Sequence, residues 1–121
     1  MTIAFWCVLV AALLPYAPFS LIKGLDPKNP RTRVKDLTGL SARTYSAHLN
    51  AFEAFPPFAA AVIISYLRLG ANGWTDVLAV AFIVARVAHM GFYLADRQPP
   101  RSAAFSIGLL IVIVMFVRAL I

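Results

Sequence analysis

Four apolar segments alternate along the chain with short breaks that combine charged residues with glycine, proline or asparagine. A membrane-spanning helix needs roughly 20 mostly apolar residues. The predicted spans cover residues 2–22, 42–69, 74–95 and 102–120. The breaks between them lie at 23–40, 70–73 and 96–101. This pattern predicts an all-α membrane protein, a single domain built as a four-transmembrane-helix bundle.

Composition supports a lipid environment. The chain has 121 residues, of which 61% are hydrophobic and only 13% charged, with a mean hydropathy of +0.80. A soluble domain of this size leaves a large share of its surface in water and has too little interior to hide so many apolar side chains. The sequence therefore predicts membrane lipid as the main partner of the protein surface.

The positive charge is concentrated in two of the three connections. The formal net charge is +6, and clusters of Lys and Arg beside apolar spans are typical of cytoplasmic loops. They predict that loops one and three are cytoplasmic and that both termini lie outside, and they argue against nucleic acid as a partner. The basic residues of loop one are Lys23, Lys28, Arg31, Arg33 and Lys35, with Arg43 at its edge, whereas loop three has Arg97 and Arg101. The single cysteine, Cys7, excludes an intrachain disulfide, and no metal site is expected.

Polar residues interrupt the second and third spans at helical spacing. On each helix they fall within a stripe about 80° wide. A charge in the middle of a membrane costs a few kcal/mol and needs a partner or a cavity. The stripes consist of Arg43, Ser46, Asn50 and Glu53 on the second span, and Arg86, His89, Tyr93 and Asp96 on the third.

Antiparallel packing places the two stripes at matching depths. Glu53 and Arg86 both lie roughly 14 Å from the cytoplasmic end of their helices. We therefore predict a carboxylate–guanidinium pair at the bottom of a polar ladder that opens toward the cytoplasm. Nearer the mouth, Asn50 is predicted to face His89, and Ser46 to face Tyr93.

Two interpretations of the ladder remain open. Polar groups in a helical bundle can hold helices together without binding anything, and Tyr93 can equally be an interface anchor. The alignment and the widening toward one end favour a ligand pocket. His48 lies on the far side of the second span and is expected to face another neighbour, such as a second subunit.

The polar runs resemble the helix signatures of the MAPEG family, the membrane-associated proteins of eicosanoid and glutathione metabolism. Residues 42–56 carry Arg43, then Asn50, Glu53 and Pro56 at the spacing of that family's second helix. Residues 85–93 have the Arg and Tyr spacing of its third helix. The resemblance covers the whole chain and matches a short, bacterial-type member, which implies a bacterial inner membrane.

The resemblance implies a homotrimer in which glutathione, as co-substrate, binds between subunits in clefts open to the cytoplasm. Asn50 and Glu53 would contact its peptide part, Arg86 would form the floor and His48 would reach in from the adjoining subunit. The full set of glutathione-binding residues expected on this basis is Arg43, His48, Asn50, Glu53, Arg86, His89 and Tyr93.

Two departures from the family pattern bear on catalysis. Transferases of the family have an arginine where this chain has Ser46, and a further arginine after the third-helix tyrosine that polarises the glutathione thiol. Pro100 stands about where that arginine would be. Arg97 or Arg101 would then take this catalytic role, because a thiolate needs a nearby cation.

Three functions follow from this sequence. The leading hypothesis is a glutathione-dependent transferase or peroxidase that acts on lipophilic substrates. The alternative is a non-catalytic protein that binds a small ligand or serves as an accessory subunit of a larger membrane complex. A proton-coupled transporter built on Glu53 ranks lower, because Arg86 is predicted to neutralise that carboxylate.

Overall fold

The computed structural model describes residues 2–25, 27–29 and 31–121, and these form helices and loops without strands. The α-helices are α1 (Ile3–Leu13), α2 (Gly39–Leu69), α3 (Gly73–Leu94) and α4 (Gln98–Leu120). Short 3-10 turns lie at Leu14–Tyr16, Phe19–Leu21 and Val34–Asp36. The described residues include four helical segments long and apolar enough to cross a membrane, which confirms the predicted all-α, four-span fold.

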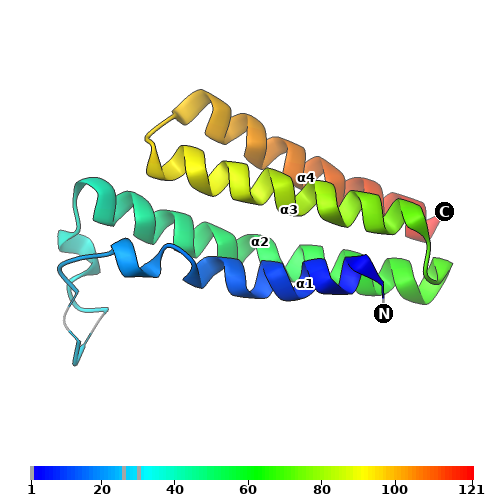
Figure 1. The fold of residues 1–121 in the computed structure, drawn as a ribbon, viewed down its shortest axis with the longest axis horizontal. Coiled ribbons are helices and arrows are strands. Elements are labelled where there is room, and N and C mark those ends of the chain that lie inside the picture. The colour runs from blue at the N-terminus through cyan, green and yellow to red at the C-terminus, as the bar shows by residue number, and fades with distance from the viewer. Residues whose placement is uncertain (1, 26, 30) are drawn as a thin grey trace.

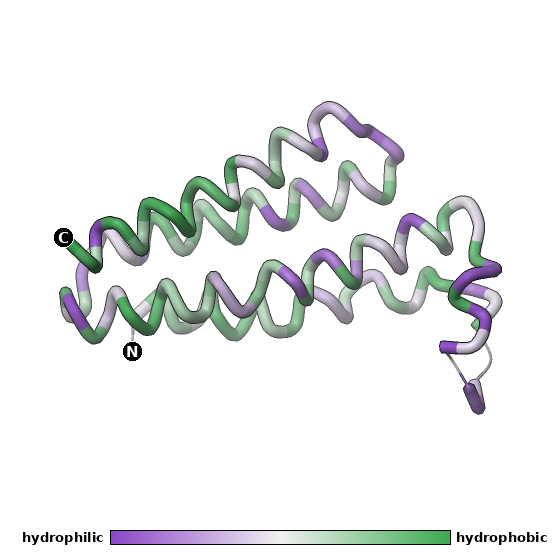
Figure 2. The backbone as a smooth tube through the Cα atoms, turned by 180° about the vertical axis from the view of Figure 1, so that it is seen from behind, coloured by the Kyte–Doolittle hydropathy of each residue, from purple (hydrophilic) through white to green (hydrophobic). Residues whose placement is uncertain are grey.

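The helices form two pairs that diverge toward one end of the molecule. α1 lies along α2, α3 lies along α4, and the pairs separate toward the end that carries the α3–α4 turn and the long loop before α2 (Figure 1). Figure 2 shows that α2 and α3 carry hydrophilic stretches in this diverging half, whereas the opposite half is mostly apolar.

Proline explains where the helix boundaries differ from those predicted. The α-helix of the first span ends at Leu13, and the chain continues through 3-10 turns to Leu21, because Pro15 and Pro18 cannot supply helical N–H donors. α4 begins at Gln98 rather than at residue 102, with Pro99 and Pro100 in its first turn. The N–H groups of the first helical turn have no partner within the helix, so their absence in proline costs nothing there. The break therefore narrows to residues 95–97, where Asp96 adopts a positive φ of 59°.

α2 is the longest element and is longer than the hydrocarbon core of a bilayer is thick. Its 31 residues span about 46 Å, against a hydrocarbon thickness of about 30 Å. Pro56 and Pro57 lie inside it and remove the N–H groups that would bond the carbonyls of Phe52 and Glu53. The polar stripe of α2 therefore lies on the side of these prolines that leads to the long loop.

The core occupies the half in which the helix pairs stay close. The rings of Phe58 and Phe82 stack with centroids 4.0 Å apart and planes 7° apart, and Val62 and Met115 are fully buried beside them. Buried alanines such as Ala61 allow the helices to approach closely. This packed layer forms a floor beneath the diverging half.

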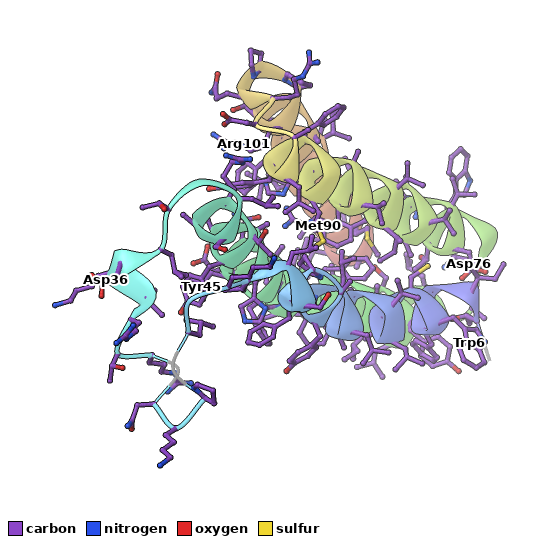
Figure 3. All side chains as sticks on the ribbon, turned by 60° about the vertical axis from the view of Figure 1, so that its left-hand side comes forward. Trp6, Asp36, Tyr45, Asp76, Met90 and Arg101 are labelled. Carbon is purple, nitrogen blue, oxygen red and sulfur yellow. The ribbon has the colours of Figure 1, made fainter. Side chains whose placement is uncertain are left out.

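Charged side chains tie helix ends to neighbouring helices. Asp76 of α3 accepts a hydrogen bond from the Ala4 N–H at the start of α1, 2.8 Å away, and the two elements meet at this end in Figure 3. Arg68 of α2 donates to the Ala119 carbonyl at the end of α4, 3.1 Å away. Both signs match the helix dipoles, and both contacts satisfy groups that a helix end leaves free.

We predict that Asp76→Ala lowers the free energy of unfolding by about 1–2 kcal/mol, because the N–H at the start of α1 loses its acceptor. Thermal unfolding in detergent measures the loss. Asp76→Asn, which keeps a side-chain oxygen, is the matched control and should lose clearly less. Equal stability of wild type and Asp76→Ala would show that this contact contributes nothing.

Candidate functional site

Two adjoining cavities lie between α2, α3 and α4. The inner cavity, of about 180 Å³, includes Glu53 and Arg86 in its lining, and the outer cavity, of about 280 Å³, includes His89 and Arg101. Asn50 and Phe105 line both. We call the two together the cleft; its outer part lies toward the α3–α4 turn, and its inner part ends above the Phe58–Phe82 stack.

Arg86 is the deepest cation of the cleft. Its side chain is only 4% exposed, and its Nη2 donates a hydrogen bond of 2.6 Å to Asn50 Oδ1. Gly108 of α4 allows the Arg86 stem to lie alongside it, since a Cβ at position 108 would be 3.8 Å from Arg86 Cδ. α2 therefore supplies the acceptor for the guanidinium, and α4 leaves room for the stem.

The predicted pair between Glu53 and Arg86 is wrong within the single chain. Both described side chains line the inner cavity, but Arg86 bonds to Asn50 and no ion pair joins it to Glu53. The prediction compared backbone depths, whereas the long Arg86 side chain extends along the cleft and meets the residue one level nearer the mouth. Glu53 is left exposed within a membrane-spanning helix, where a carboxylate needs a partner or water.

His89 supplies an unpartnered polar atom beside the outer cavity. The side chain is 3% exposed, and its Nδ1 has no hydrogen-bond partner among the residues that the structure describes. Its ring packs against Tyr93, with centroids 5.6 Å apart. A buried nitrogen without a partner costs about 1–3 kcal/mol. The atom is enclosed by protein, so the His89 ring would have to turn before this nitrogen could bond a ligand in the cleft.

The structure separates the two candidate catalytic arginines. Arg101 stacks over the Tyr93 ring, with its Cζ 4.3 Å from the ring centroid, and both residues line the outer cavity; Figure 3 shows Arg101 at the diverging end. Arg97 instead lines a surface groove with Ala88 and Pro100, outside the cleft. Of the two, Arg101 is the one that lines the cleft.

Arg43 and His48 lie outside the lining of the two cavities. Arg43 Nε donates to the Leu94 carbonyl at the end of α3, 3.4 Å away, and so joins α2 to α3. His48 is 8% exposed, and its Nδ1 is 2.6 Å from the Pro15 carbonyl, to which it donates. The other neighbour expected for His48 is thus, within one chain, the Pro15 turn after α1, and contact of His48 with a ligand in an adjoining subunit stays a prediction.

One wall of the cleft was missed in the sequence. α4 reads as a uniformly apolar span, yet it supplies Ser102, Phe105, Ser106 and Gly108 to the lining. Arg101 and Phe105, and likewise Ser102 and Ser106, stand four residues apart, which places each pair on one helix face. That spacing was the available signal, although serine and glycine in a membrane helix commonly serve helix packing alone.

We predict that Asn50→Leu lowers the free energy of unfolding by about 3 kcal/mol or more, because a buried guanidinium loses its acceptor. Thermal unfolding in detergent is the measurement. Asn50→Asp keeps an acceptor of similar shape and should retain most of the stability. A leucine variant as stable as the aspartate variant would mean that Arg86 finds another partner.

A comparison with protein families adds independent evidence. The model of the MAPEG family matches residues 3–121, and this agrees with the signatures seen in α2 and α3. No curated protein and no solved structure matched the chain. Since the match spans essentially the whole chain, the protein belongs to the MAPEG family.

Proposed function

We propose that the cleft binds glutathione and that the protein uses it, as a transferase or peroxidase, on lipophilic substrates. The observation that carries this proposal is the grouping of Arg86, Asn50, His89 and Arg101 along one cleft. Family membership supports glutathione as the ligand, because MAPEG proteins are known for glutathione-related functions.

The charges along the cleft suit glutathione. The tripeptide carries two carboxylates and one amino group, so it needs cations and a single anion arranged along its length. Arg86 and Arg101 supply positive charge, and Glu53 offers a carboxylate to the amino group. Asn50 and His89 add amide and imidazole groups for the peptide bonds.

Arg101 would favour the reactive form of the thiol. A cation beside the sulfur lowers a thiol pKa from about 8.5 and raises the thiolate fraction. In a transferase, the thiolate attacks an electrophilic carbon, and a carbon–sulfur bond forms as the leaving group departs with its electron pair. In a peroxidase, it attacks the O–O bond to give an alcohol and a sulfenic acid, which a second glutathione converts to the disulfide and water.

The inner cavity offers space for a lipophilic substrate. Apolar side chains of α3 and α4, including Phe82, Leu109 and Val112, make up much of its wall. Leu109 and Glu53 are exposed on the single chain, so the cavity reaches the surface within membrane-spanning segments. A substrate dissolved in the bilayer would thus enter without crossing water.

The exposed Glu53 also supports assembly into a homotrimer. A carboxylate facing hydrocarbon is costly, and a neighbouring subunit would cover it and complete the cleft. The family resemblance implies such clefts between subunits. The family resemblance supports a bacterial inner membrane protein. The basic loops favour termini outside and loops one and three cytoplasmic, and the mouth of the cleft would then face the cytoplasm.

A non-catalytic role is the second candidate. Ser46 is present where family transferases carry an arginine, so the cleft has one cation fewer, and a binding protein or accessory subunit would tolerate this.

Transport is less well supported. Glu53 lacks the arginine ion pair that counted against it, but the Phe58–Phe82 stack and buried Val62 lie beneath the cleft and leave no opening toward the far side within the described core.

We predict that Arg101→Gln weakens glutathione binding about tenfold, which corresponds to losing one charge-assisted contact. Calorimetry on the detergent-purified protein measures the affinity. Arg118→Gln is the matched control, since Arg118 also lies on α4 over an aromatic ring, Trp74, but at the opposite end. Equal losses in both variants would contradict the placement of glutathione in the cleft.

Turnover of a bulky lipophilic electrophile should decrease as the side chain at position 108 becomes larger. Gly108→Ala adds a methyl group at ordinary contact distance from Phe82 and Arg86, so we expect a small loss, whereas Gly108→Leu fills the inner cavity and should lower kcat/KM about tenfold or more. Initial rates of thiol consumption measure the series. Glutathione binding without turnover of electrophiles or peroxides by the wild type would favour the non-catalytic alternative.

A further inference from the structure

A second depression, the outer groove, runs between α3 and α4 on a face separate from the cleft lining. It comprises two adjoining cavities of about 480 Å³ each, which share Ala88, Phe92 and Pro100. No residue of the cleft lining belongs to it. The α3–α4 pair thus has a polar side at the cleft and an apolar side at the groove.

Small side chains create the depth of the outer groove. α3 contributes alanines to its lining, including Ala81, Ala85 and Ala88, and α4 contributes Ala103 and Ala104. Ala85 and Ala104 are 7% exposed and form the bottom, while Val84 and Ile107 are 63% and 54% exposed and form the rims. The result is an open apolar depression along the helix pair.

The groove is long enough to span one leaflet of a bilayer. On α3 and the residue that follows it, the lining extends from Ala81 to Ala95, which corresponds to about 21 Å along the helix axis. One leaflet of hydrocarbon is about 15 Å thick. The groove is therefore long enough to take the part of an extended acyl chain that one leaflet holds.

The polar end of the groove carries positive charge. Arg97 is exposed and lines this end beside Pro100, and α4 begins at Gln98, which directs the positive end of its dipole to the same place. Asp96 is adjacent in sequence but is not among the lining residues. An anion at the end of an apolar groove is the complement of this arrangement.

From this charge and shape we infer that the outer groove binds an anionic phospholipid of the leaflet that faces the α3–α4 turn. One acyl chain lies between α3 and α4, and the phosphate contacts Arg97. Basic pockets between membrane helices recognise anionic headgroups in this way. The inference is independent of what occupies the cleft.

Native mass spectrometry of the detergent-purified protein tests it, with phosphatidylglycerol and phosphatidylcholine of identical acyl chains added in turn. The wild type should retain phosphatidylglycerol preferentially. Arg97→Gln should reduce that retention about fivefold, as expected for one arginine near the headgroup, and leave phosphatidylcholine unaffected. Arg33→Gln, which removes an exposed charge from loop one, is the charge-matched control. Equal retention of both lipids by the wild type would overturn the inference.

Two further variants test the groove itself. Ala103→Phe, at an exposed lining position, should fill the groove and abolish retention of phosphatidylglycerol, with thermal unfolding confirming that the variant is folded. Ala103→Cys in a Cys7→Ser background reports a competing occupant. If it forms disulfides between copies in liposomes, the groove is covered by another protein chain and the lipid assignment is wrong; absence of the crosslink agrees with lipid.

Discussion

The burial of one guanidinium organises this bundle. Arg86 lies within a membrane-spanning helix and is 4% exposed, so its charge needs an internal partner. Asn50 of α2 provides the acceptor, and Gly108 of α4 leaves room for the stem. Meeting these needs keeps α2, α3 and α4 at a spacing that leaves cavities around the guanidinium. The cleft is therefore a direct consequence of placing a cation among apolar helices.

The two ends of the bundle are secured differently, and this determines where the cleft opens. At the closed end, Asp76 holds the start of α1 and Arg68 holds the end of α4. At the diverging end, Arg43 joins α2 to the end of α3, and the first turn of α4 contains Pro99 and Pro100. The start of α4 is connected to α3 by the hydrogen bond from the Arg97 N–H to the Phe92 carbonyl and by Arg101 over the Tyr93 ring, and the outer cavity lies beside it.

The spans and the polar stripes were predictable, because apolar length and helical period are properties of the sequence alone. The hydrogen-bond partner of Arg86 was not predictable. The long side chain of Arg86 decided between Glu53 and Asn50, and backbone depth does not contain that information. Arg97 and Arg101 are four residues apart, as on one helix face, yet Arg97 precedes the helix with φ −103° and ψ 86°. The two side chains therefore diverge to opposite sides of the α3–α4 pair.

The position of Pro100 changes the argument about catalysis. In the sequence it stands about where family transferases place an arginine, which counted against activity. In the structure it lies in the first turn of α4 and lines the outer groove, while Arg101 lines the cleft. With Ser46 in place of a second arginine, Arg101 would be the main cation at the mouth. Binding of an anionic thiol and activation of its sulfur would then depend on the same side chain, so loss of that charge would weaken both together.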